Sequence, residues 1–475
     1  MAMSRKTWVS ILFMTLCVSS ASASTWEPAA SMSVPRATHT ATLLNNGNVL
    51  VTGGYDYTAG TLVHASAELY SSAANAWTPS ATMQRPRRNH TATLLQDGRI
   101  LVTGGFSGGS YLAHAEVYNP TTNTWTATAP MASPHYEHAA VRLQDGRVLV
   151  MGGFVGSSVT TSAEVYNPAT NAWSSAGWMG TARAQHSAVL LANGKVLVIG
   201  GYNGSTYWSS AELYDPATNS WSPAGGMSSA RVLFPAVRLA NGRVLVPGGN
   251  SGGTVLSSVD VYDPATNSWS PAAPMGTPRY VHSATLLSDG KVLVAGAYGR
   301  TSAEVYDPAT SAWSSVGSMS ITRGEHTATL LSNGKVLVAG GNSGSQVATA
   351  ELYMPSGGAV NLGSVLGTPV TQGTTCGGTN QSTPTCSSNN TAPDRGFFWT
   401  APSSGTFLFT TAGSDFDTVL QINDATGSTT LGCNDDVNGT FQSAVSLALS
   451  AGQQIRISVD GYRTRCGNFR LNISQ

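Results

Sequence analysis

Charged side chains are scarce in this chain of 475 residues. They make up 10% of it, whereas about 25% is usual in soluble proteins. The 24 Lys and Arg residues balance the 24 Asp and Glu residues, so the formal net charge is zero. This composition excludes a general nucleic-acid binder, which needs Lys and Arg to displace phosphate counterions. It also excludes a protein that is held electrostatically on an anionic membrane surface.

Long apolar runs are missing as well. The longest begins at Trp8 and ends at Val18, which is too short for a permanent membrane anchor. A positive start at Arg5 and Lys6 precedes it, and the small residues of segment 21–23 follow it. This order predicts a secretory signal over residues 1–23. We therefore expect a chain without a transmembrane segment that is secreted or held at the cell surface.

Cysteine is absent from residues 24–355 and occurs four times after them. An even number in an exported chain predicts two disulfides. Four cysteines allow three pairings, and their spacing does not decide between them. We favour the pairing that closes the two most local loops, which joins Cys376 to Cys386 and Cys433 to Cys466.

One phrase of sixteen residues recurs seven times, every 44 to 51 residues. In each copy two apolar runs flank a turn such as Asn-Gly or Asp-Gly, which indicates a β-hairpin. A second phrase follows and contains a Glu, a Tyr, an Asp/Asn-Pro turn and a Trp. Together they predict four short strands per unit. The first phrase begins at residues 39, 90, 138, 186, 234, 282 and 326.

The Gly-Gly, Tyr and Trp positions of these units resemble the kelch family, over residues 24 to about 355. The resemblance implies a β-propeller with one blade per unit. The Tyr and Trp side chains are expected to fill the wedge between blades. Trp26 precedes the first hairpin, whereas the last unit stops at Pro355 without a Trp. We therefore expect seven blades, with the N-terminal segment supplying the outer strand of the last blade.

The tail lacks the repeat. Residues 356–367 are predicted to be a linker and residues 368–475 a small β-sandwich with the two disulfides. Phrases such as SGTFLFTTAGSDFDTVLQI resemble the bacterial pre-peptidase C-terminal module. The predicted fold class is therefore all-β: a seven-bladed kelch propeller followed by a sandwich.

Residues that repeat in every unit are interpreted as structural. An Arg, or His135 in the third unit, begins each first strand, and an acidic residue precedes each repeat Tyr. We expect these to form one ion pair per blade. A His, or Phe234 in the fifth unit, follows the Arg by three positions. Six His spread around a ring are too far apart to share one metal ion, because His–metal bonds are roughly 2 Å long.

Residues that break the repeat are the candidates for binding. They lie in the loops between second and third strands and at the starts of first strands. Exposed aromatic side chains with few charges are suited to stacking on sugar rings or anchoring a protein partner. The predicted ligand-binding residues are Tyr55, Asp56, Tyr57, Arg88, Tyr111, Tyr136, Tyr207, Trp208 and Tyr280.

Two kinds of metal chemistry bear on this chain. Kelch propellers include copper radical oxidases related to galactose oxidase, which need a Cys cross-linked to a Tyr and His ligands from both domains. The propeller segment here has no Cys and the tail has no His, so we do not expect that chemistry. In the tail, acidic residues in loop-like phrases predict a Ca²⁺ site. They are Asp415, Asp417, Asp435, Asp436 and Asp460.

These features lead to one functional prediction and two alternatives. We predict a non-catalytic, monomeric protein that presents its propeller loops to a glycan or an extracellular protein, and assign it no catalytic residues. The first alternative is a carbohydrate-active enzyme of the oxidase or sugar-epimerase type, which rests on fold analogy. The second is a structural matrix component.

Overall fold

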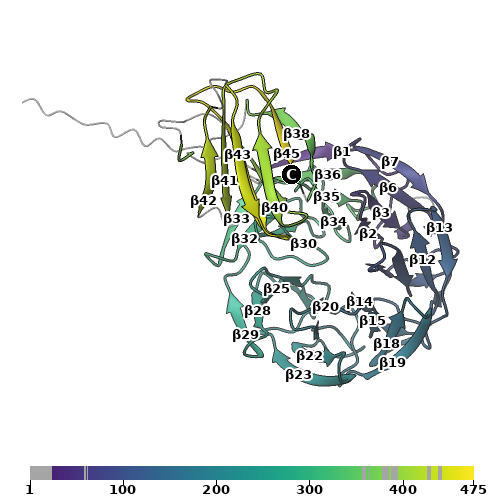
Figure 1. Cartoon of the computed structure of the whole chain (residues 1–475). Coiled ribbons are helices and arrows are strands. Elements are labelled where there is room, and N and C mark those ends of the chain that lie inside the picture. The colour runs from purple at the N-terminus through teal and green to yellow at the C-terminus, as the bar shows by residue number, and fades with distance from the viewer. Residues whose placement is uncertain are drawn as a thin grey trace, which may run out of the picture.

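The structure is a computed structural model that describes residues 24–57, 60, 62–355, 360–362, 364–376, 384–386, 394–424, 429–436 and 441–475. The predicted signal segment 1–23 lies outside these residues, as does part of the predicted linker. No helix occurs in the described residues, and so none of them forms a helix that could cross a membrane. Figure 1 shows a ring of small sheets and a separate sandwich of longer strands.

The ring consists of seven four-stranded antiparallel sheets, which confirms the seven-bladed propeller. The innermost strands contact one another around the axis; they are β2 (Thr40–Leu43), β8 (Thr91–Leu94), β14 (Ala139–Arg142), β20 (Ser187–Leu190), β24 (Val237–Arg238), β30 (Ser283–Leu286) and β34 (Thr327–Leu330). The second strands are β3 (Val49–Thr52), β9 (Ile100–Thr103), β15 (Val148–Met151), β21 (Val196–Ile199), β25 (Val244–Pro247), β31 (Val292–Ala295) and β35 (Val336–Ala339).

The outer half of each blade follows from the second phrase of the repeat. The third strands are β6 (Ala67–Ser71), β12 (Ala115–Asn119), β18 (Ser162–Asn167), β22 (Ser210–Asp215), β28 (Val259–Asp263), β32 (Ala303–Asp307) and β36 (Ala350–Met354). The outermost strands are β7 (Ala76–Ser80), β13 (Thr124–Ala127), β19 (Ala172–Trp178), β23 (Ser220–Gly226), β29 (Ser268–Ala272), β33 (Ala312–Val316) and β1 (Thr25–Ala29).

The seventh blade joins the two ends of the propeller segment. Strand β1 pairs antiparallel with β36, and Trp26 lies opposite Tyr353. The sequence places the closing strand at this position because Trp26 is the repeat Trp that the last unit lacks. Every blade of the ring is thus four-stranded, and β36 is not left as an open edge.

Each repeat Trp fixes its blade to the preceding one. Its ring packs against the Tyr opposite it in the same blade, with ring centroids 5.0–5.2 Å apart. Its indole N–H donates a hydrogen bond of 2.6–2.8 Å to a backbone carbonyl of the neighbouring blade. Valine, leucine and isoleucine from adjacent second strands, such as Val49 and Val51, fill the remaining space between blades. The wedge-filling role predicted for Tyr and Trp is confirmed.

The Gly pair that ends each second strand is required by the next blade. Gly53 has a φ of +64°. A Cβ atom there would lie 2.5 Å from the carbonyl oxygen of Arg87 and 2.6 Å from Cε1 of His90. Only glycine allows both this backbone conformation and this approach of the neighbouring blade.

The sandwich has one five-stranded and one four-stranded sheet. The first contains β37 (Val360–Asn361), β39 (Arg395–Thr400), β44 (Gln454–Gly461), β41 (Thr418–Asp424) and β42 (Thr430–Asn434). The second contains β38 (Gly367–Thr374), β45 (Asn468–Ser474), β40 (Gly405–Thr410) and β43 (Ala444–Leu449). Strand β37 and the first residue of β38 fall within the predicted linker, so sandwich structure begins earlier than the sequence indicates.

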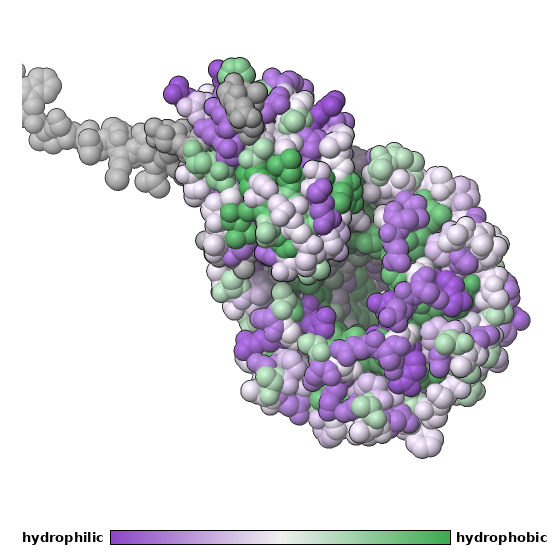
Figure 2. Space-filling model, in the orientation of Figure 1, coloured by the Kyte–Doolittle hydropathy of each residue, from purple (hydrophilic) through white to green (hydrophobic). Residues whose placement is uncertain are grey.

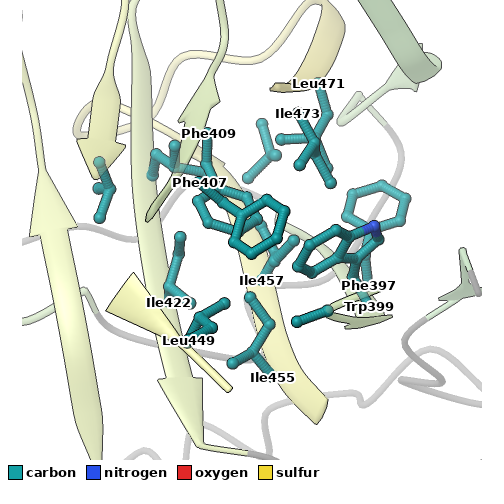
Figure 3. Close-up of a cluster of buried hydrophobic side chains, with 14 of the residues drawn as sticks. Phe397, Trp399, Phe407, Phe409, Ile422, Leu449, Ile455, Ile457, Leu471 and Ile473 are labelled. Carbon is teal, nitrogen blue, oxygen red and sulfur yellow. The ribbon is translucent and has the colours of Figure 1, made fainter. Parts of the chain in front are cut away.

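Apolar side chains from both sheets of the sandwich form one core. Trp399, Phe407 and Phe409 lie at its centre, with ring centroids 5.0–5.5 Å apart. Ile455, Ile457 and Ile473 pack around these rings, as Figure 3 shows. The core residues are fully buried.

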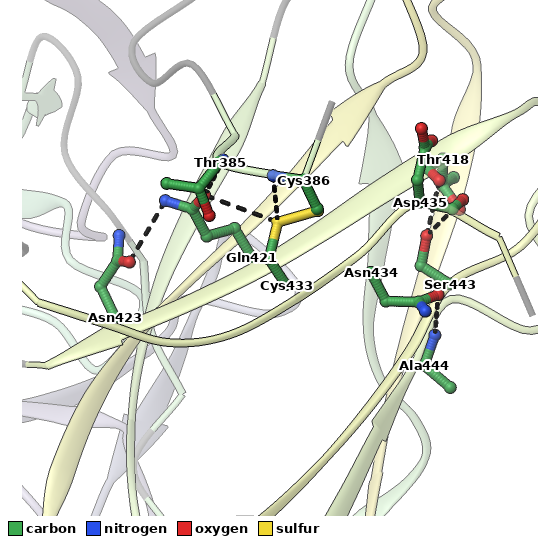
Figure 4. The surroundings of a disulfide bond; sticks show 10 residues. All are labelled: Thr385, Cys386, Thr418, Gln421, Asn423, Cys433, Asn434, Asp435, Ser443 and Ala444. Carbon is green, nitrogen blue, oxygen red and sulfur yellow. Dashed lines mark hydrogen bonds between the residues drawn. A yellow bond between two sulfur atoms is a disulfide. The ribbon is translucent and has the colours of Figure 1, made fainter. Parts of the chain in front are cut away.

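The predicted disulfide pairing is wrong. The structure joins Cys376 to Cys466 and Cys386 to Cys433. The reason is sheet topology: β38 pairs with β45, which is far away in sequence, and this pairing brings the residues just beyond Thr374 and just before Asn468 together. Figure 4 shows the second bridge, where the loop that contains Cys386 meets β42. Loop length in the sequence does not report such contacts.

Candidate functional site

The start of each innermost strand has an unusual backbone. One non-glycine residue per blade adopts a φ between +49° and +55°, a conformation that L-residues seldom adopt. It immediately precedes the repeat His, or Phe234 in the fifth blade. These residues are Thr38, Asn89, Glu137, Gln185, Leu233, Val281 and Glu325. We call them the axial residues.

The backbones of the axial residues form a closed circle of hydrogen bonds. The N–H of each donates to the carbonyl oxygen of the axial residue in the preceding blade, over 3.0–3.4 Å, and the last bond joins Thr38 to Glu325. Seven bonds compensate for seven strained residues. Because the main chain makes this circle, the side chains at these positions are free to differ from blade to blade.

The axial residues and the repeat His residues line one cavity of about 430 Å³ on the ring axis. Figure 2 shows the ring hollowed at its centre. The wall is not symmetric. Five consecutive axial residues, from Glu325 through Thr38, Asn89 and Glu137 to Gln185, are polar. Leu233 and Val281 are apolar, as are Phe234 and Pro235 beside them.

The six His residues form the deeper wall, where burial disfavours their charged form. Burial lowers the pKa of each, and that of His186, His282 and His326 falls to about 3. Four of them hold a hydroxyl of the preceding blade through Nε2, as His138 does with Thr91 Oγ1 at 3.0 Å. These contacts between blades fit the structural role that the sequence predicts for the His positions.

The buried ion pairs lie behind this wall. Arg87 is fully buried and contacts Glu116 at 2.6 Å. The same pair recurs in five other blades, and His135 replaces the Arg in the third, 3.4 Å from Glu164. Burial opposes ionisation of Glu164, but hydrogen bonds from His135 and two backbone N–H groups outweigh it and lower its pKa. The predicted Arg–acid bridge therefore lies within each blade and is structural.

Aromatic residues surround one side of the cavity mouth. In six blades the first residue after the Gly pair lies at the same end as the axial residue, since it pairs with the start of the innermost strand, as Phe154 pairs with Tyr136. In the sixth blade Ala297 pairs with Arg323 of the next blade instead. Short hairpins continue the loops: β4–β5 (Tyr55–Asp56, Leu62–Val63), β10–β11 (Phe106–Ser107, Ser110–Tyr111), β16–β17 (Phe154–Val155, Ser158–Val159) and β26–β27 (Asn250–Ser251, Thr254–Val255).

Arg88 connects the aromatic rings of two blades. Its guanidinium lies over the ring of Tyr55 at 5.2 Å and over that of Phe106 at 5.3 Å. It also donates a hydrogen bond to the Tyr57 hydroxyl. Phe106, Tyr111 and Tyr136 then pack on one another with centroids 5.3–5.7 Å apart. We call Tyr55, Tyr57, Arg88, Phe106, Tyr111 and Tyr136 the aromatic arc.

Two axial carboxylates, those of Glu325 and Glu137, connect the aromatic arc to the cavity by hydrogen bonds. The Tyr55 hydroxyl donates to Glu325 Oε2 at 3.0 Å, and burial with the charge of Glu325 raises the pKa of Tyr55 to about 12. Burial also raises the pKa of Glu137, against hydrogen bonds from Gln185 and Tyr136. Glu137 Oε2 accepts a bond of 2.7 Å from the Gln185 amide.

The predicted binding residues divide into three groups. Tyr57 and Tyr207 are exposed. Tyr55 and Asp56 are buried, so they can position other residues of the mouth but offer little surface to a ligand. Tyr207 packs on Tyr202. Trp208 is half-buried and its indole N–H donates to Ala182 O. Arg88, Tyr111, Tyr136 and Tyr280 are half-buried at the mouth, where Tyr280 packs on Tyr298.

Sequence reasoning missed the axial residues as a set. Their signal is the variable position between the repeat Arg and the repeat His, which reads Thr, Asn, Glu, Gln, Leu, Val and Glu around the ring. The repeat Arg and the repeat His are nearly the same in every blade, whereas the axial residue between them differs. These differences make the cavity wall asymmetric although the ring of blades is nearly symmetric.

The acidic residues of the tail are only partly brought together. The charges of Asp417 and Asp436 add to burial in raising the pKa of Asp435. Asp415 is elsewhere engaged, since it accepts hydrogen bonds from Asn468. In the described part of the chain, no group of three or more His, Cys, Asp or Glu side chains could hold a metal ion. The Ca²⁺ site stays a prediction.

The whole chain is similar in fold to a fungal alcohol oxidase of the AA5 family, solved in complex with copper. The match has a TM-score of 0.63 at 18% identity and covers 93% of this chain and 94% of that one. At this identity it shows the fold alone. The residues present do not fit a copper centre. The propeller segment 24–355 contains no Cys and the tail contains no His, so the Cys–Tyr cross-link and the His ligands from both domains are missing.

The sequence itself places the chain in a family. No curated protein matches it. Residues 5–182 and 137–341 match the KLHDC2/KLHL20/DRC7 Kelch-repeats domain. The matched span covers the repeats that form the blades and more than half of the chain. This protein therefore belongs to the kelch-repeat propeller family.

Proposed function

We propose that this protein is a binding protein whose propeller takes a glycan at the mouth of its axial cavity. The aromatic arc is the observation that carries the proposal. It offers the faces and edges of several Tyr and Phe rings next to polar axial residues, and pyranose rings present apolar C–H faces and hydroxyl edges to such surfaces. The two disulfides are consistent with export to an oxidising compartment.

A rigid scaffold supports this role. The axial hydrogen bonds and the Gly pairs fix the mouth before any ligand arrives, so little conformational entropy is lost on binding. The alternative of a carbohydrate-active enzyme shares the same mouth and ligand class. Two carboxylates, Glu137 and Glu325, are present there, but the former is hydrogen-bonded to Gln185 and the latter to Tyr55. We therefore favour binding without turnover.

Tyr57 provides the direct test. It is 46% exposed and packs on Tyr55 with centroids 4.6 Å apart. We expect Tyr57→Ala to weaken glycan binding by at least about tenfold, since a Tyr that acts as a binding hot spot contributes about 2 kcal/mol or more. Titration calorimetry with the oligosaccharides that a glycan array selects measures the effect, and the melting temperature should change little.

Trp178 is the matched control. It is 72% exposed at the end of the outermost strand β19 and is not among the residues that line the axial cavity. Trp178→Ala removes an exposed aromatic residue of comparable size and should leave binding unchanged. Equal losses in the two variants, or tight binding by Tyr57→Ala, would show that the arc is not the site.

A further inference from the structure

Two carboxylates at the cavity mouth, Glu137 and Glu325, form no ion pair with any described residue, although the charge of Arg88 acts on Glu137. None of the ion pairs among the described residues includes Glu137 or Glu325. Their hydrogen bonds come from neutral groups. Glu137 accepts from the amides of Gln185 and Asn89 and from the Tyr136 hydroxyl. Glu325 accepts from the hydroxyls of Tyr55 and Tyr298. The acidic residues before the repeat Tyr, by contrast, each face an Arg or His. Negative charge at the mouth is therefore only partly compensated.

A buried polar group in the same cavity also lacks a partner. His186 is 9% exposed and lines the cavity beside Gln185. Its Nε2 has no hydrogen-bond partner among the described residues. In four other blades the preceding blade supplies a hydroxyl, but here it presents Ala139 and Met151. Like Nε2 of His282, this atom is fully buried between two blades, so a ligand in the cavity does not reach it.

An apolar part of the cavity wall restricts the rest of the ligand. Leu233, Val281 and Phe234 form a continuous apolar segment, which Glu325 borders on one side and Gln185 on the other. A small inorganic cation would gain nothing from this segment. A ligand with a charged head and an apolar face would contact both the carboxylates and this segment.

We propose that the mouth selects a glycan that carries a protonated amine, that is, an amino sugar that is not N-acetylated. This inference rests on the proposed function. The ammonium group would donate charge-assisted hydrogen bonds to Glu137 or Glu325. The C–H face of the ring would lie against the aromatic arc or the apolar wall.

The one cation of the aromatic arc does not favour an anionic ligand instead. The guanidinium of Arg88 is held between the rings of Tyr55 and Phe106 and bonded to Tyr57. An acidic sugar at the axial residues would meet two carboxylates. The balance of charge around the cavity is negative, and it matches a cationic ligand.

The test compares three tetrasaccharides that differ only at C2: β-1,4-linked glucosamine, N-acetylglucosamine and glucose. The mature full-length protein is titrated with each by calorimetry, at a pH where the glucosamine amine is protonated. We expect the glucosamine tetramer to bind at least about tenfold more tightly than the other two, which corresponds to one charge-assisted hydrogen bond. Glu137→Gln and Glu325→Gln together should abolish that preference and leave the weaker binding of the neutral sugars.

These substitutions should preserve the fold, because Gln185 already holds the same left-handed backbone conformation at the equivalent axial position. Glu27→Gln is the control, since it removes the same charge from the outer strand β1, where Glu27 pairs with Lys335. If the neutral sugars bind as tightly as glucosamine and the double variant is unaffected, amine selection is wrong but glycan binding stands. If none of the three binds, amine selection is wrong, and the glycan array then decides separately whether glycan binding stands.

Discussion

Replacing Arg87 by Met is expected to destabilise the propeller by about 3–5 kcal/mol, the range found when one partner of a buried ion pair is removed. Arg87 is fully buried. Besides the 2.6 Å contact with Glu116, it donates hydrogen bonds to the carbonyl oxygens of Gly104 and His114 at 2.8 and 3.1 Å. Met fills similar space but leaves a buried carboxylate without a cation. Chemical denaturation, followed through the unfolding transition of the propeller, measures the loss.

Two further variants separate the causes of this loss. Arg99→Met removes an Arg that is 36% exposed and pairs with Asp97 on the surface, and it should cost less than about 1 kcal/mol. Adding Glu116→Leu to Arg87→Met removes the unpaired charge and should restore part of the stability. Recovery should be incomplete, because the carbonyls of Gly104 and His114 and the N–H of Gln84 lose their partners. A loss for Arg87→Met no larger than that for Arg99→Met would refute the structural role of the pair.

The propeller could be predicted almost entirely from the sequence, because each blade is formed by residues that are close in sequence and the same pattern recurs in every unit. Each hairpin is specified by a two-residue turn between apolar runs, and seven copies give the blade number. Even the closing strand has a sequence signal, since Trp26 stands outside the first unit. The family match covers this repeated part, whereas the likeness of the tail to a pre-peptidase C-terminal module stays a prediction.

The disulfides and the site could not be predicted in the same way, because they depend on contacts between distant segments. Cys376 meets Cys466, 90 residues away, because β38 pairs with β45. Glu325 of the seventh blade accepts a hydrogen bond from Tyr55 of the first blade, 270 residues away in sequence. No spacing within one repeat reports these contacts. The variable axial position was visible in the sequence, but only the circle of backbone hydrogen bonds shows that its seven side chains surround one cavity.

The pairing of β1 with β36, which closes the ring, is expected to be its least stable point. We call this pairing the seam. Trp26 packs on Tyr353 and donates a hydrogen bond to Gly317 O. Trp313 makes the same contacts in the sixth blade, with Tyr306 and Ala273 O. We expect Trp26→Ala to cost about 3 kcal/mol, at the lower end of the range for removing a packed aromatic ring, and to cost more than Trp313→Ala.

The difference arises from what each Trp holds in place. The outer strand of the sixth blade, β33, follows β32 across a tight turn, so it stays near its partner when Trp313 is lost. Strand β1 has no such tether to β36, since the two lie at opposite ends of the propeller segment. When β1 detaches, the edge of β36 is exposed and can pair with another chain. Trp26→Ala should therefore also increase proteolysis before Thr40 and promote association at high concentration. If Trp26→Ala and Trp313→Ala have equal stability and equal protease resistance, the pairing of β1 with β36 is as stable as the corresponding pairing in the sixth blade, and the prediction is wrong.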